Sequence, residues 1–143
     1  RKAGSLAFVA EGLLKECDPH QRKTPSIINF ISANSFILNT KHNQSKYLKA
    51  IRPTKIVFLD FDQLIILFSK YQELRAIYEN ASADYEDGIA FREFILEEKS
   101  VAERIHLFNT NYRHILSNLR KKDIANYLNV DYDYFIRLYN KLL

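Results

Sequence analysis

Residues 121–138 have the sequence KKDIANYLNVDYDYFIRL, which contains two short helical patterns separated by a break at Asn129. Two short helices that cross steeply need a very small residue at their closest approach, and Ala125 supplies it. Asn tolerates the positive φ of such a turn better than most residues, and Asp131 follows as a candidate N-cap. The apolar anchors of the two helices are Ile124, Leu128, Val130, Phe135 and Leu138. The stretch therefore predicts a helix-turn-helix.

With these anchors buried, the side chains left on the outside suit double-stranded DNA. Arg137 has the shape to bind guanine through two hydrogen bonds, and Asn140 can pair with adenine or a phosphate. Asp133 repels phosphate unless it accepts from a cytosine amine, and Ile136 contacts only a thymine methyl group. The predicted DNA-contacting residues are Lys121, Lys122, Tyr132, Asp133, Ile136, Arg137, Asn140 and Lys141. The pattern alone leaves open a plain helical hairpin at the end of an all-α tail.

The chain has 143 residues, of which 47% are hydrophobic, enough for one good core or two small ones. No apolar run has the length of a membrane span. The single cysteine, Cys17, excludes an internal disulfide and fits a reducing compartment, so we expect a cytoplasmic protein. Residues 1–4 contain neither a signal region nor an initiator Met, which predicts an incomplete N-terminus.

Charge is distributed unevenly along the chain, whose formal net charge is +4. Residues 1–70 carry 11 basic and 5 acidic side chains, residues 71–99 carry 3 and 8, and residues 100–143 carry 7 and 4. Alternating signs indicate three regions with different roles. The modest positive excess in the last region is compatible with DNA binding that weakens strongly as salt rises.

The first 70 residues have the pattern of short strands. Strand-like runs cover residues 5–17, with a break at Gly12, and residues 26–31 and 54–59, while residues 32–45 form a polar stretch. Residues 5–17 and 26–31 are expected to pair as a hairpin. Closely spaced strands of this kind predict a small antiparallel barrel or sandwich.

From residue 60 the apolar spacing becomes helical. The pattern predicts a short helix over 62–69, one long helix over 71–99 and a further helix over 101–116. A long helix with acids on one side and apolar residues on the other commonly packs against a copy of itself, which predicts a dimer. Packing of this helix wholly within its own subunit is the alternative.

The order of a strand module, a long helix and a helix-turn-helix resembles the Crp/Fnr regulators. The resemblance is carried by residues 8–13 (FVAEGL), 30–36 (FISANSF), 50–55 (AIRPTK), 102–104 (AER) and 122–128 (KDIANYL). It implies an α+β fold with a cyclic-nucleotide-binding-like β jelly roll, N-terminally incomplete, over 1–70, a dimerisation helix over 71–99 and a DNA-binding helix-turn-helix domain over 100–143. It also implies a homodimer that binds a palindromic operator.

The loop that matches the family's phosphate cassette departs from the cyclic-nucleotide-responsive members. Those members have a Gly-Glu pair and an Arg-Ala pair there, because a buried phosphate needs backbone donors and a fixed guanidinium. Residues 34–47 contain no Gly, Glu or Arg, so we predict no response to cAMP. The candidate pocket for an unidentified small-molecule effector comprises Asn34, Ser35, Lys41, Ser45 and Lys46, and a solvated basic loop is the alternative reading.

A second functional hypothesis is a degenerate sensor or interaction module that binds a protein partner instead of DNA, through Tyr132, Tyr134, Phe135 and Ile136. An enzyme is the weakest hypothesis. The sequence shows no paired-carboxylate motif, no metal-ligand spacing, no nucleophile elbow and, with three glycines in all, no phosphate-cradling glycine loop. We therefore expect neither catalysis nor a cofactor or bound metal.

Overall fold

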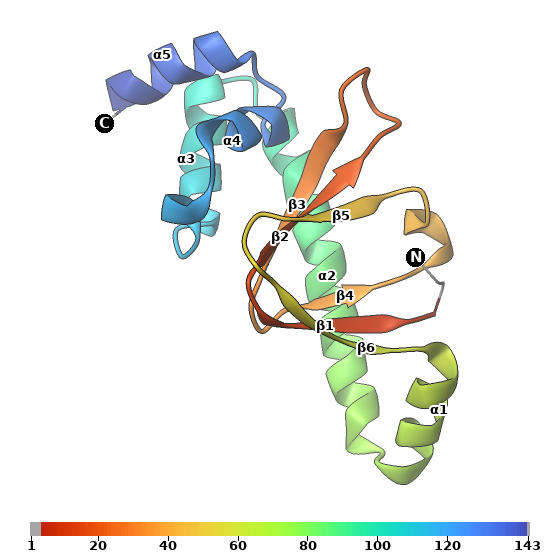
Figure 1. The fold of residues 1–143 in the computed structure, drawn as a ribbon. Coiled ribbons are helices and arrows are strands. Elements are labelled where there is room, and N and C mark those ends of the chain that lie inside the picture. The colour runs from red at the N-terminus through yellow and green to blue at the C-terminus, as the bar shows by residue number, and fades with distance from the viewer. Residues whose placement is uncertain (1–3, 143) are drawn as a thin grey trace.

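The computed structural model describes residues 4–142, which form six strands packed as two small antiparallel sheets and five α-helices (Figure 1). Residues 1–3, which contribute to the expectation of an incomplete N-terminus, lie outside the described part. The first sheet has the order β4-β1-β6, and the second has the order β3-β2-β5. The strands are β1 (Leu6–Glu11), β2 (Leu13–Asp18), β3 (Ser26–Ser32), β4 (Phe36–Leu38), β5 (Tyr47–Ala50) and β6 (Lys55–Leu59).

The chain passes from the first sheet to the second at Gly12, between β1 and β2. Its φ of 109° is a conformation that residues with a side chain rarely adopt. A Cβ here would also lie 2.6 Å from Cα of Thr54 and 2.7 Å from the carbonyl oxygen of Pro53. The glycine break expected within residues 5–17 is therefore the corner at which the two sheets diverge.

The strand pairing confirms one expected hairpin and corrects another part of the prediction. Strands β2 and β3 pair antiparallel, from Leu13 opposite Ser32 to Asp18 opposite Ser26. The earlier part of residues 5–17 was wrongly assigned to the same hairpin, because β1 pairs with β4 and β6 instead. The stretch 32–45 is also not wholly loop, since it contains β4, whose three apolar residues are too few to show a period.

The helices are α1 (Phe61–Lys70), α2 (Glu73–Glu97), α3 (Val101–Asn111), α4 (Lys121–Tyr127) and α5 (Tyr132–Leu142). Two short 3₁₀ turns, η1 (Lys41–Asn43) and η2 (Leu116–Asn118), lie between these elements. The predicted long helix is thus confirmed as α2, whereas the helix expected over 101–116 ends earlier, at Asn111. Within the described part of the chain, none of the helices combines the length and apolar character needed to cross a bilayer.

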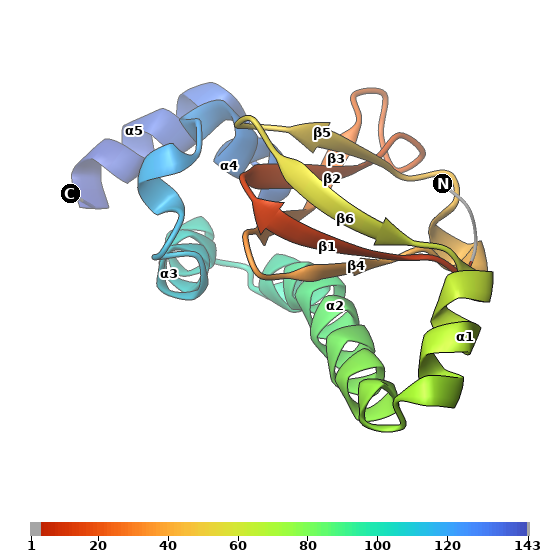
Figure 2. The ribbon, with the colours of Figure 1, turned by 60° about the horizontal axis from the view of Figure 1, so that its bottom comes forward.

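Helix α2 runs along the two sheets, residues 6–59, which we call the β domain, and connects α1 to α3 (Figures 1 and 2). At its beginning it forms a V with α1, and at its end it leads into α3. Its buried side chains are Ala81, Tyr85, Arg92 and Ile95. The opposite side of the helix is exposed along most of its length.

Two apolar clusters stabilise the fold. The smaller lies between the sheets and contains Val9, Leu14 and Ile37 together with Tyr85 of α2. The larger combines residues of β2 and β3, namely Leu13, Cys17, Ile27 and Phe30, with buried residues of α3, α4 and α5. Strand and helix residues from opposite ends of the sequence therefore share one core.

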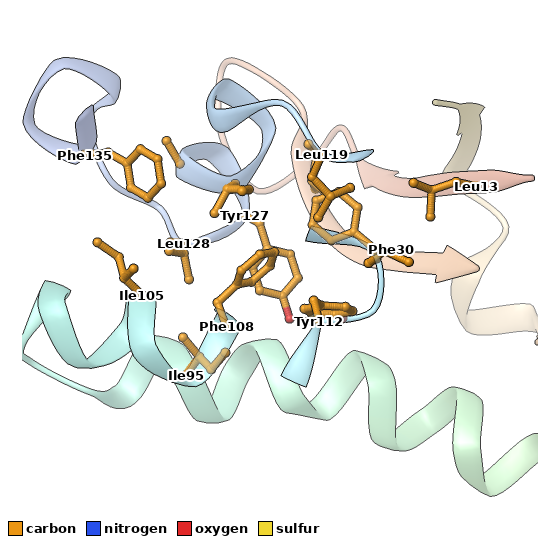
Figure 3. Packing of buried hydrophobic residues seen from close by; sticks show 14 of the residues in the cluster. Leu13, Phe30, Ile95, Ile105, Phe108, Tyr112, Leu119, Tyr127, Leu128 and Phe135 are labelled. Carbon is orange, nitrogen blue, oxygen red and sulfur yellow. The ribbon is translucent and has the colours of Figure 1, made fainter. Parts of the chain in front are cut away.

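Aromatic rings occupy the centre of this shared core (Figure 3). The ring of Phe108 lies 5.8 Å from that of Phe30, 4.8 Å from that of Tyr112 and 5.1 Å from that of Tyr127, measured between centroids. Burial raises the pKa of the Tyr112 and Tyr127 hydroxyls and of the nearby Cys17 thiol. These groups stay neutral near pH 7, and Cys17 is a buried free cysteine of β2.

Candidate nucleic-acid interface

Helices α4 and α5 cross through a tight turn at Asn129, whose φ is 55°. The backbone N–H of Val130 donates to the carbonyl of Ala125 at 3.0 Å, which closes the end of α4. Ala125 is 1% exposed, as its place at the closest approach predicts. The carboxylate of Asp131 accepts from the backbone N–H of Tyr134 at 3.2 Å, so the predicted N-cap contact of α5 is confirmed.

The outer face of α4 and α5 presents most of the side chains assigned to DNA. Exposed residues of this set are Lys121, Lys122, Tyr132, Asp133, Arg137, Asn140 and Lys141. Ile136 is half-buried and packs against the larger core, so it is less available to a partner than the others. The ammonium of Lys121 lies 5.1 Å from the ring centroid of Tyr139, which connects the start of α4 to the end of α5.

A buried ion pair attaches α4 to the second sheet. Nζ of Lys15 in β2 lies 3.1 Å from Oδ1 of Asp123, and the two side chains are 10% and 8% exposed. Arg120, just before α4, donates to the same carboxylate at 3.3 Å. Since a buried charge without its partner is costly, this pair fixes the side of α4 that faces the β domain.

A second set of contacts joins the β2–β3 loop to the α4–α5 turn. Arg22 donates from Nη1 to Oδ1 of Asn129 at 2.8 Å, and from Nη2 to the carbonyl and Oδ1 of Asn126 at 3.2 and 3.1 Å. Oδ1 of Asn126 also accepts from the backbone N–H of Ile27 at 2.8 Å, and its Nδ2 donates to the carbonyl of Pro25 at 3.1 Å. The Asn126 amide thus binds the peptide groups at the start of β3.

Two further arginines bind carbonyls at the end of α4. Nε of Arg92, in α2, donates to the carbonyl of Tyr127 at 2.8 Å, and Nη1 of Arg104, in α3, donates to that of Leu128 at 3.4 Å. Burial lowers the pKa of Arg92 from its usual value. Cations at a helix C-terminus complement the helix dipole, so α2 and α3 both stabilise this end of α4.

Sequence reasoning missed Lys15, Arg22, Arg92 and Asn126. Lys15 gave the clearest available signal, because it is a charged residue within an otherwise apolar strand and therefore needs a buried partner. Neither its position nor that of Arg22 identifies the partner, which lies more than 100 residues away in both cases.

A cavity of about 460 Å³ lies between β3, the β3–β4 turn, α2 and the end of α3. Asn34, which has a φ of 69°, and Ser35 line it together with Asn80, Asp84 and His114. The other predicted effector residues, Lys41, Ser45 and Lys46, do not line this cavity. The structure therefore brings two of the five together and leaves three on the loop around η1.

Side chains of α2 and η1 meet the buried Glu16 of β2. The hydroxyl of Tyr85 lies 2.8 and 2.7 Å from the two carboxylate oxygens of the fully buried Glu16. Asn43 of η1 donates to the same hydroxyl at 3.1 Å. Among the residues that the structure describes, no three His, Cys, Asp or Glu side chains are grouped in a way that could hold a metal ion.

The arrangement of strands and helices matches solved structures of other proteins. FixK2 from Bradyrhizobium japonicum has a TM-score of 0.83 at 15% identity, over 99% of this chain and 76% of that one. A transcriptional regulator of the CRP family from Thermus thermophilus has a TM-score of 0.72 at 11% identity, over 99% and 76%. CLP from Xanthomonas campestris, a c-di-GMP responsive global regulator, has a TM-score of 0.68 at 14% identity, over 98% and 77%.

No family model and no curated protein matches the chain by sequence. At identities of 11–15%, the feature shared with these three structures is the fold. The chain has the α+β fold of CRP-family transcription regulators.

Proposed function

We propose that this chain is a homodimeric, DNA-binding transcription regulator of the Crp/Fnr type, that it acts in the cytoplasm, and that it does not respond to cAMP. The observation that carries the proposal is the pair α4 and α5, with Asn129 in a positive-φ turn and seven of the eight predicted DNA-contacting residues exposed. A helix held across another in this way can enter the major groove with its outer face.

In this proposal, residues 1–70 form an effector domain of jelly-roll type. Residues 71–99 form the dimerisation helix, and residues 100–143 form the helix-turn-helix domain. Support comes from the two antiparallel three-stranded sheets, whose orders are β4-β1-β6 and β3-β2-β5.

The exposed side of α2 supports the homodimer. Six exposed residues recur there at alternating spacings of four and three, namely Ala76, Asn80, Ala83, Asp87, Ala90 and Phe94. This spacing places them in one stripe, as at the seam of two parallel helices. The alanines permit close approach of the second copy, and Phe94, which is 60% exposed, gains most from burial.

Phe94→Glu is expected to convert the dimer to a monomer at micromolar concentration, because it places a charge in the apolar part of the seam. Sedimentation equilibrium measures the change. Phe58→Glu is the matched control, since Phe58 is 52% exposed but lies on β6. An unchanged dimer in the Phe94 variant would remove α2 as the interface.

The central experiment is selection of bound sequences from a pool of genomic fragments around the gene, followed by fluorescence anisotropy at two salt concentrations. Enrichment of defined sequences, with affinity that falls steeply as salt rises, supports a DNA-binding regulator. A folded, dimeric protein that enriches no sequence at low salt refutes the proposal.

Arg137→Ala should weaken binding to the selected DNA by about 1–3 kcal/mol, or about 5- to 150-fold, because it removes a two-bonded contact to a base. Anisotropy with the same DNA measures the loss. Arg75→Ala, which removes an exposed arginine from the first turn of α2, should leave the affinity nearly unchanged. Equal affinities of wild type and the Arg137 variant would exclude Arg137 from the interface.

We assign the effector role, if the regulator uses a small molecule, to the cavity lined by Asn34 and Ser35. Its described lining contains neither Lys nor Arg, which makes a cyclic nucleotide with its charged phosphate a poor fit.

The alternative function is binding of a protein partner through α5. It is favoured by Tyr132 and Tyr134, which are 44% and 45% exposed, whereas Phe135 is fully buried and unavailable. Such an apolar contact would respond little to salt.

A further inference from the structure

We propose that Arg22 and Asn126 are positioning residues, which hold α4 and α5 at a fixed orientation on the β2–β3 hairpin and thereby set the spacing of the two DNA half-sites that the dimer accepts. This inference depends on the proposed function. Neither residue belongs to the outward-facing set assigned to DNA, and Arg22 lies in the β2–β3 loop.

The contacts of Arg22 converge on the turn between the two helices. Its guanidinium donates to Asn129, which forms the turn, and to both oxygens of Asn126, while its Nε donates to Oγ of Ser26 at 2.8 Å. Asn129 lies two residues before Asp131, whose carboxylate caps α5. Any rotation of α5 relative to the β domain therefore alters the geometry of these bonds.

Asn126 forms the other half of the connection. Its side-chain oxygen accepts from the backbone of Ile27 and its side-chain nitrogen donates to the carbonyl of Pro25, so one amide group binds two peptide groups of the β domain. The same oxygen also accepts from Arg22. With these partners the amide of Asn126 can adopt only one orientation. This restricts both the sliding of α4 along its axis and its rotation about that axis.

The apolar core beneath these contacts does not give the same constraint. Burial of apolar surface is non-directional, so the core stabilises the docking of the helices without itself selecting an angle between hydrogen-bonding groups. Hydrogen bonds weaken steeply away from their preferred angles, and a planar guanidinium with several acceptors permits little rotation. The Lys15–Asp123 ion pair and the Arg92 bond to Tyr127 hold α4 on the β domain and on α2, and the Arg22–Asn126 contacts are the directional bonds at the turn that leads into α5.

Orientation has a direct consequence in a dimer on DNA. Two recognition helices must reach successive major grooves, about 34–36 Å apart, and this distance is set by the bodies that carry the helices. If the attachment of α4 and α5 to the β domain is loosened, the two recognition helices can reach half-sites at other spacings. The contacts of each helix to its own half-site stay unchanged.

The test uses the full-length protein and DNA selected by the wild type. The same sequence is then prepared with one base pair added or removed between the half-sites, and as a single half-site. For the wild type we expect on the order of tenfold preference for the selected spacing. Arg22→Ala should reduce this preference to about twofold or less, with unchanged affinity for the single half-site.

Two further variants separate positioning from general destabilisation. Asn129→Gly removes one acceptor of Arg22 but retains a residue that adopts the positive φ of the turn, and it should show a partial loss of spacing preference. Lys23→Ala removes a positive charge from the neighbouring exposed position and should behave as wild type. Circular dichroism at the assay temperature confirms that each variant is folded.

Each outcome decides between the proposals. If the wild type binds DNA and folded Arg22→Ala keeps the full spacing preference, the positioning role is overturned while the proposed function stands. If Arg22→Ala loses affinity equally for all spacings and for the half-site, its role is general stability and the inference is again overturned. If the wild type enriches no DNA, the proposed function fails, and the inference fails with it.

Discussion

Lys15→Met is expected to lower the free energy of unfolding by about 3–5 kcal/mol, because it leaves the buried carboxylate of Asp123 without its main partner. The ammonium of Lys15 and the carboxylate are both nearly enclosed, so water cannot replace the lost contact. Arg120 also donates to Asp123 and retains part of the compensation, which places the expected loss at the lower end of this range. Urea denaturation measures the change, with the slope against urea concentration unaltered.

The double variant Lys15→Met with Asp123→Leu provides the discriminating control. Removing both charges abolishes the desolvation cost, so this variant should regain most of the stability of the wild type. Lys49→Met is the control for loss of a lysine alone, since Lys49 is exposed on β5 opposite Lys15 and its removal should cost less than about 0.5 kcal/mol. A single variant at Lys15 that is as stable as wild type would show that the ion pair contributes nothing to the docking of α4.

Phe108→Ala is expected to cost about 3–5 kcal/mol, because it leaves a cavity among rings that come from both halves of the chain. Phe108 is fully buried and contacts Phe30 of β3 as well as Tyr112 and Tyr127. The loss should therefore destabilise the strands and the terminal helices together. Calorimetry should show one transition at a lower temperature, not a separate transition for each part.

Phe58→Ala is the matched control, since Phe58 lies half-exposed on the edge strand β6 and its truncation creates no cavity. Its expected effect is within about 0.5 kcal/mol. A Phe108 variant that unfolds in two steps, with the β domain unaffected, would contradict the shared core as a cooperative unit.

The elements predicted with success from the sequence are those fixed by local chemistry. The turn at Asn129, the cap at Asp131 and the small residue at Ala125 each act within a few residues of their own position, so the sequence pattern contains the whole cause. Helix α2 was found for a similar reason, because its apolar positions repeat with the helical period over 25 residues.

The elements that were missed depend on partners far away in the chain. Strand β4 forms because it pairs with β1 and because Ile37 is buried in the smaller core, not because three residues have a strand pattern. The partners of Lys15 and Arg22 in the terminal helices are separated from them by more than 100 positions. The partner of a buried charged residue cannot be identified from a single sequence.

The residues of the candidate site fall into the same two groups, those determined by local sequence and those that depend on distant parts of the chain. Exposure of Arg137, Asn140 and the lysines of α4 follows from the burial of their neighbours at helical spacing, and could be predicted. The assignment of Lys41, Ser45 and Lys46 to an effector pocket relied on the resemblance alone, and the cavity that the structure contains is lined by Asn34 and Ser35 but not by these three.

The core shared by β2, β3 and α3–α5 has a consequence for protein engineering. A helix-turn-helix tethered by a flexible linker can be exchanged between proteins as an independent cassette. Here Leu13, Cys17, Ile27 and Phe30 complete the interior of the terminal helices, so residues 100–143 alone would expose the faces that these strands cover. A chimera must therefore transplant the β2–β3 hairpin together with α3, α4 and α5 as one piece.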